Sequence, residues 1–145
     1  NIISGNIWIM TYEEIVIKQN RLWRGEREPI GVERDVKSEI IPFLKTKYIL
    51  AITGVRRSGK SYLLYQLIDT LLEEKPPENI LYINFDDPAY VRVRNDPKGL
   101  DGLYSDYLKL KNPTGKTYLF LDEVQSVPGW EKWVKSRYDM EENIK

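Results

Sequence analysis

The stretch ITGVRRSGKSY, residues 52–62, decides how this chain folds. It contains the pattern G-x-x-x-x-G-K-S from Gly54 to Ser61. A short apolar run at residues 48–53 precedes it, and a helical apolar pattern begins near Gly59. A glycine-rich loop between a buried strand and a helix is the setting in which this pattern binds nucleotide phosphates. The sequence therefore predicts a phosphate-binding loop, or Walker A motif, at this point.

Each part of the loop has a physical reason. Gly54 and Gly59 permit backbone angles and close approaches that a Cβ atom would block. Successive backbone N–H groups then converge on phosphate oxygens, and the following helix adds its partial positive end. Lys60 is expected to reach the β- and γ-phosphates, and Ser61 to give its hydroxyl to magnesium. The residues expected to contact the nucleotide are Gly54, Val55, Arg56, Arg57, Ser58, Gly59, Lys60, Ser61 and Tyr62. For Arg56 and Arg57, surface charge is an equally good interpretation.

A second motif is the acidic pair Asp122-Glu123, which follows an apolar strand predicted at residues 117–121. Ligands of open α/β folds bind at the carboxyl ends of the strands. Asp122 is suited to the magnesium shell through water, as in a Walker B motif, and Glu123 to polarising the attacking water. The alternative is that the pair only caps a strand. The phosphate loop upstream favours the catalytic interpretation.

The same region separates ATP from GTP. GTPases generally place Asp-x-x-Gly after this strand, whereas this chain continues Asp122-Glu-Val-Gln125. The guanine-binding pattern Asn-Lys-x-Asp does not occur in the sequence. ATP with Mg²⁺ is therefore the expected ligand.

Outward from these motifs, strands and helices alternate. The apolar patterns predict strands at residues 80–85 and 117–121, and helices at 34–46, 59–72, 99–111 and 130–140. Pro42 should kink or shorten the first helix, and Leu100, Leu103, Tyr104, Tyr107 and Leu108 should point inward from the third. Alternation of this kind predicts a three-layer α/β/α fold with a mainly parallel sheet. We expect a P-loop domain at residues 34–145, preceded by an irregular lead-in at residues 1–33.

Composition excludes several classes of chemistry. The chain has 145 residues with 22 basic and 22 acidic side chains, so no net charge draws it to nucleic acid or to a membrane surface. Arg21, Arg24 and Arg27 form a local basic cluster, but Glu26 and Glu28 dilute it. Without cysteine or histidine, disulfides, thiolate metal sites and histidine catalysis are ruled out. No signal or membrane segment is visible, which favours the cytoplasm.

Other polar and aromatic residues have ordinary interpretations. Asp86 and Asp87 are expected to shape a turn before Pro88, with a role in holding magnesium or water as the alternative. Trp130 and Trp133 are expected to pack in the core or an interface. Tyr82 and Tyr118 lie within predicted strands and are interpreted as packing residues.

The chain resembles the AAA-like archaeal and bacterial ATPases of the P-loop superfamily. Three stretches carry the resemblance: ITGVRRSGKS at residues 52–61, YINFDDP at 82–88, and LDEVQSVPGWEKWVKSRYD at 121–139. It implies ATP hydrolysis with a glutamate after the acidic strand, coupled to an unknown client. The alternative is a nucleotide-binding or protein-interaction fragment without turnover.

The resemblance also implies a further strand, with a polar sensor residue, between the P-loop strand and the acidic strand. The chain stops at Lys145, before that strand. Unpaired strand edges cost free energy. We therefore expect the isolated monomer to be poorly stable, rearranged, or completed by self-association or by another chain.

Overall fold

The computed structural model describes residues 11–29, 31–32, 35–46, 49–52, 59–140 and 144–145. Its longer elements, in chain order, are α1 (Tyr12–Gln19), α2 (Val36–Ile40), α3 (Lys60–Leu71), β1 (Ile80–Asn84), α4 (Val91–Asn95), α5 (Gly99–Lys111), β2 (Tyr118–Asp122) and α6 (Trp130–Met140). Short 3₁₀ helices occur at Arg21–Arg24, Ile41–Lys45, Pro77–Asn79, Pro88–Tyr90 and Val124–Ser126. The predicted strands at 80–85 and 117–121 and the helices at 99–111 and 130–140 are confirmed to within a residue or so.

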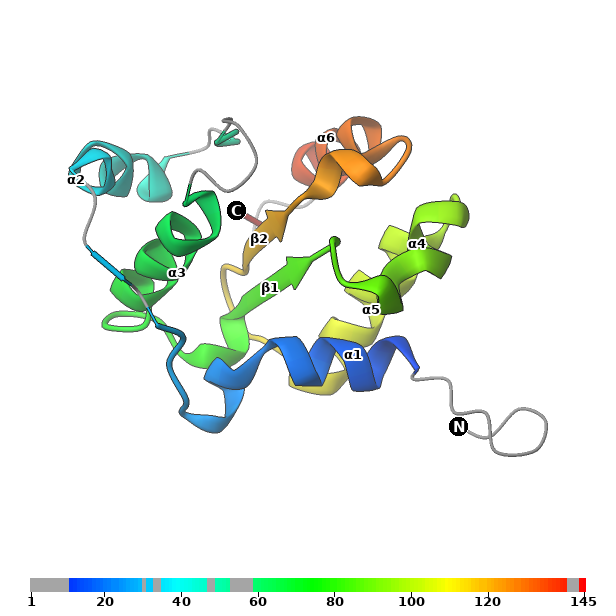
Figure 1. The fold of residues 1–145 in the computed structure, drawn as a ribbon, viewed down its shortest axis with the longest axis horizontal. Helices are drawn as coiled ribbons and strands as arrows, with labels where there is room; N and C mark the ends of the chain where they lie inside the picture. Colours follow the sequence, from blue (N-terminus) through cyan, green and yellow to red (C-terminus); the bar gives the residue numbers. More distant parts are fainter. Residues whose placement is uncertain (1–10, 30, 33–34, 47–48, 53–58, 141–143) are drawn as a thin grey trace.

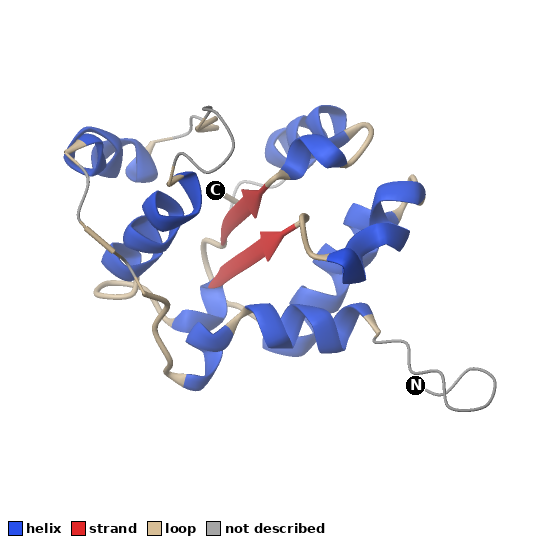
Figure 2. Ribbon diagram, in the orientation of Figure 1, coloured by secondary structure: helices blue, strands red, loops and turns tan. Residues whose placement is uncertain are grey.

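The two strands form a parallel sheet with helices on both faces (Figures 1 and 2). The register runs from Ile80 opposite Tyr118 to Asn84 opposite Asp122. Successive side chains of a strand point to opposite faces. Ile80 and Tyr82 therefore share one face with Tyr118 and Phe120, and the ends of both strands lie side by side.

The first face of the sheet packs against α3. Its apolar side chains join a core cluster with the strands. The helix contributes Leu63, Leu67 and Leu71, spaced by four residues, and the neighbouring Ile68. Burial of one such side chain stabilises the fold by about 1.5–3 kcal/mol. This packing fixes the start of α3 beside the carboxyl ends of the strands.

The second face packs against α1 and α5, which also contact each other. Leu100, Leu103, Tyr104 and Tyr107 of α5 are buried, as predicted. Leu108 is 37% exposed, so its predicted inward position is wrong. The buried residues follow the spacing i, i+3, i+4 and i+7, and Leu108 falls at the border of that stripe.

Residues 12–24 are helical, so the predicted irregular lead-in is wrong for this part of the chain. A capping box at Thr11 and Glu14 begins α1. The segment then covers the outer edge of β1 with side chains. Gln19 bonds both backbone groups of Asn84, and the fully buried Asn20 bonds both backbone groups of Tyr82.

The indole of Trp23 completes this edge by donating to the carbonyl of Ile80 at 2.9 Å. Three side chains thus replace a neighbouring strand at positions 80, 82 and 84. An exposed strand edge is a template for pairing with other chains, and covering it prevents that pairing.

Among the described residues, the opposite edge of β2 is paired only near its start. Ile144 forms a parallel bridge with Thr117, and the backbone of Lys145 exchanges hydrogen bonds with Thr117 and Leu119 at 2.7 and 2.6 Å. Residues 49–52 are not part of a strand, so the strand predicted at 48–53 is not formed in its described part. They line a cavity together with β2.

The helix predicted at 34–46 is interrupted as expected. It divides into α2 and the 3₁₀ helix Ile41–Lys45, which has Pro42 in its first turn. Proline has no N–H and cannot continue an α-helical ladder. Among the described helices, none has the length and apolar character needed to cross a membrane.

Candidate functional site

The start of α3 carries the described part of the predicted phosphate loop. Gly59 has φ +85° and precedes the helix, and Lys60 and Ser61 form its first turn. Only glycine adopts this backbone conformation without strain. Gly59 has no side chain with which to cap α3, and the N-terminus of a helix favours an anion. Gly54, Val55, Arg56, Arg57 and Ser58 lie outside the described residues.

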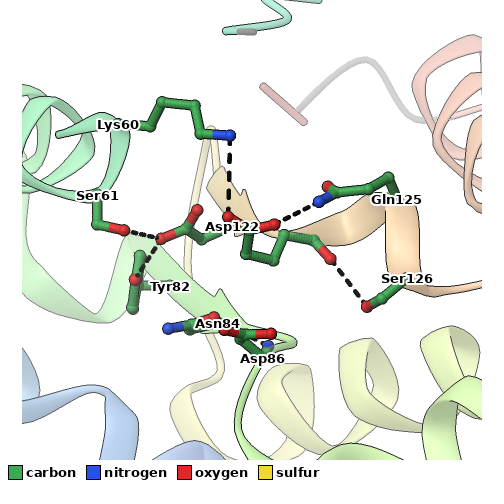
Figure 3. Close-up of polar contacts among 9 residues, drawn as sticks. Lys60, Ser61, Tyr82, Asn84, Asp86, Asp122, Gln125 and Ser126 are labelled. Atoms are coloured by element: carbon green, nitrogen blue, oxygen red, sulfur yellow. Dashed lines mark hydrogen bonds and ion pairs between the residues drawn. The ribbon is translucent and has the colours of Figure 1, made fainter. Parts of the chain in front are cut away.

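Asp122 ends β2 and lies directly beside this helix start (Figure 3). The hydroxyl of Ser61 donates to Asp122 Oδ2 at 2.5 Å, although the two residues are 61 positions apart. Asp122 is only 4% exposed. A buried carboxylate next to a serine hydroxyl supplies the hard oxygen ligands that Mg²⁺ prefers, directly or through water. The donor set therefore fits the predicted magnesium site.

Glu123 adopts a left-handed backbone conformation, with φ 56°. This conformation is uncommon for residues other than glycine and is often found at functional sites. It turns the chain sharply after β2. The Glu123 carboxylate lies 3.8 Å from Lys60 Nζ and also accepts a hydrogen bond from Gln125. The predicted basic and acidic residues are thus brought together.

Tyr82 is the site residue that the sequence did not reveal. Its hydroxyl donates to Asp122 Oδ2 at 2.9 Å (Figure 3). The hydroxyl of Tyr65 lies 3.3 Å from that of Tyr82. Burial, followed by the hydrogen bond with Tyr65, raises the pKa of Tyr82 above its ordinary value. The phenol therefore keeps its proton. Interpreting Tyr82 as a packing residue was correct for its ring, which is buried against α3, but missed this polar contact.

The remaining candidates have ordinary roles or stay open. Asp87 accepts a hydrogen bond from the N–H of Ala89 and begins the 3₁₀ helix Pro88–Tyr90, which confirms the predicted turn. The N–H of Asp86 bonds the side chain of Asn84. Tyr62 is half exposed and packs edge-on against Tyr65, and its predicted contact with nucleotide stays a prediction.

Trp130 and Trp133 pack against the core, as predicted. Trp133 lies edge-on to Tyr104 at 5.9 Å, and its indole N–H donates to Asp101. The arginine cluster of the N-terminal segment is paired with acids: Arg21 and Arg24 with Glu26, and Arg27 with Asp69. Each arginine of the cluster thus lies beside a carboxylate.

A cavity of about 500 Å³ opens beside the acidic pair. Lys60, Asp122 and Glu123 line one end of it, and residues 49–52, β2 and α6 line the rest. Most of this lining is apolar. The site therefore borders a space large enough for a small molecule or an additional segment of chain.

A lysine and a serine at a helix start, facing carboxylates at a strand end, define a P-loop nucleotide-binding domain. A protein-family model described as an AAA domain matches residues 46–145, and the chain belongs to this family. The family indicates an ATPase-like domain that binds nucleotide.

Two relatives extend this similarity. An uncharacterized protein of Haemophilus influenzae is 40% identical over 99 residues, which cover 68% of this chain and 24% of that protein. An uncharacterized protein of Methanocaldococcus jannaschii is 32% identical over 133 residues, covering 92% of this chain and 26% of the relative. The chain thus spans about a quarter of the length of these curated relatives. No solved structure matches it.

Proposed function

We propose that this domain binds ATP with Mg²⁺ and hydrolyses it, in the service of a client that the fold does not identify. One observation carries the proposal: the first turn of α3 and the end of β2 meet through Ser61 and Asp122 at 2.5 Å and through Lys60 and Glu123 at 3.8 Å. Phosphate loop and acidic pair lie far apart in sequence, and this meeting is what the hydrolytic interpretation requires.

Each residue has a proposed role. The N–H groups of α3 and the Lys60 ammonium bind phosphate oxygens, and an incoming phosphate competes with Glu123 for Lys60. Ser61 and Asp122 hold the magnesium ion, Asp122 through water. Bound Mg²⁺ would neutralise charge on the phosphates. Glu123, released from Lys60, accepts a proton from the attacking water or orients it.

Phosphate release distinguishes this function from the alternative, a nucleotide-binding or interaction fragment without turnover. We expect Glu123→Gln to lower the rate by about a hundredfold or more, the usual contribution of a general base, while ATP still binds. Glu73→Gln, an exposed glutamate in the turn after α3, is the matched control and should have no effect. Equal rates for wild type and Glu123→Gln would remove the hydrolytic proposal and leave binding.

We also propose that an added strand completes the domain, from a second copy or from another segment of polypeptide. The parallel pairing that Ile144 and Lys145 begin beside β2, and the cavity next to it, support this. Sedimentation of the 145-residue chain tests the self-association form of the proposal. We expect a concentration-dependent dimer; a stable monomer with a sharp, concentration-independent unfolding transition would count against both forms.

A further inference from the structure

The carboxylate of Asp122 is held from the sheet as well as from α3. Its Oδ2 atom accepts hydrogen bonds from Ser61 at 2.5 Å and from Tyr82 at 2.9 Å (Figure 3). Tyr82 and Asp122 are 5% and 4% exposed, so water competes little with this contact. A phenol has one proton, and an ionised carboxylate only accepts. That proton therefore belongs to the bond with Asp122, the shorter of the two contacts of the Tyr82 hydroxyl.

Two donors on one oxygen fix the rotation of the carboxylate. The last torsion of an aspartate is broad and roughly twofold, so an unsupported side chain samples many orientations. Within the described part of the chain, the side-chain hydrogen bonds to Asp122 both end on Oδ2. The other oxygen, Oδ1, is left to accept from a metal-bound water. Loss of one donor would widen the range of orientations of Oδ1.

The two donors are not equivalent. Ser61 is itself a proposed ligand of magnesium, so its hydroxyl must serve both the metal and Asp122. Tyr82 lies on β1, with its ring packed against Tyr65 at a centroid distance of 5.2 Å. Its backbone is held in turn by Asn20. The sheet therefore supplies a second donor to Asp122 that is not itself a proposed ligand of the metal.

We propose that Tyr82 is a positioning residue of the magnesium site, whose hydroxyl holds Asp122 in the orientation that accepts metal-bound water. The inference rests on the proposed binding of ATP with Mg²⁺. A purely structural Tyr82 would contribute only its ring, because the ring alone fills the space against α3. The role of the hydroxyl is therefore separable from the role of the ring.

Tyr82→Phe keeps the ring and removes the hydroxyl. The measurement is ATP affinity as a function of Mg²⁺ concentration, with EDTA for the metal-free value. We expect the half-saturating Mg²⁺ concentration to rise about tenfold or more, the scale on which outer-shell partners of metal ligands act. ATP affinity in EDTA should change less than about twofold. Tyr65→Phe is the matched control: it removes a hydroxyl 3.3 Å from that of Tyr82 but without contact to Asp122, and should leave the Mg²⁺ dependence unchanged.

The outcomes separate this inference from the proposed function. If wild type binds ATP with Mg²⁺ dependence and Tyr82→Phe keeps that dependence, the positioning role is overturned and the function stands. If wild type shows no Mg²⁺-dependent binding, both are overturned.

A second measurement covers the case in which Tyr82→Phe fails to fold. In wild type carrying ¹³C at tyrosine Cζ, the Tyr82 signal should shift when Mg²⁺ joins the ATP complex, and that of Tyr118 should not. An unmoved Tyr82 signal overturns the role.

Discussion

Replacement of Asn20 by alanine is expected to be one of the most destabilising single changes in this domain. Asn20 is fully buried, and its amide replaces a strand at the outer edge of β1. Its Nδ2 donates to the carbonyls of Val16 and Tyr82, both at 2.8 Å, and its Oδ1 accepts from the N–H of Tyr82 at 2.7 Å.

The size of the effect follows from the groups left without a partner. The carbonyl of Val16 keeps the backbone N–H of residue 20, at 3.1 Å, in the alanine variant. The N–H and the carbonyl of Tyr82 lose their partners, and a buried unpaired polar group costs about 1–3 kcal/mol. Partial entry of water reduces the sum, so we expect a loss of about 2–4 kcal/mol. This is a large share of the 5–15 kcal/mol typical of folded domains.

Urea unfolding followed by circular dichroism measures the loss. The midpoint should fall while the slope with denaturant stays constant, because the surface exposed on unfolding is nearly unchanged. The matched control is Asn95→Ala, an exposed asparagine at the end of α4, which should change stability by less than about 0.5 kcal/mol. A loss below about 1 kcal/mol for Asn20→Ala would refute the account of the covered edge.

Two further predictions concern α5. A Cβ atom at Gly99 would lie 2.8 Å from the Cα of Val93, whereas one at Gly102 would meet nothing within 4 Å. Gly99→Ala should therefore destabilise by about 1–3 kcal/mol, and Gly102→Ala should stabilise by about 0.5–1 kcal/mol; equal urea midpoints would contradict this. The hydrogen bond from Arg137 lowers the pKa of Asp101 in the folded state. The ionised Asp101 carboxylate therefore stabilises the fold at pH values above its pKa in the unfolded chain, and this stabilisation is lost as the pH falls through its pKa in the folded state. The midpoint difference between wild type and Asp101→Asn should shrink below about pH 4, and a difference that persists to about pH 2 would show that charge is not its source.

The sequence predicted the elements whose apolar pattern matches their packing. The stripe of α5 and the runs of β1 and β2 are of this kind, because each buries a continuous apolar face. Residues 12–24 were missed because only Ile15, Val16 and Leu22 of this segment are buried apolar residues, too few for a helical period to stand out, and the rest of its contacts with the sheet are polar. A glutamine, an asparagine and an indole covering a strand edge leave no periodic apolar signal.

The candidate site was predicted in its motifs but not in its supporting contacts. Lys60, Ser61, Asp122 and Glu123 lie together as the motif spacing indicated. Tyr82 could not be recognised, because its contact with Asp122 depends on the register of two strands 40 residues apart. The strand predicted at 48–53 needs a neighbouring strand with which to form hydrogen bonds. Residues 49–52 line the cavity instead.

Titration of the 145-residue chain with ATP in the presence of Mg²⁺ tests the central claim most directly. We expect wild type to bind ATP and Lys60→Ala to bind it about 10- to 100-fold more weakly, since a charged hydrogen bond contributes about 1.5–3 kcal/mol. Lys109→Ala, at an exposed lysine of α5, should bind like wild type. Equal affinity of wild type and Lys60→Ala for ATP would contradict the account.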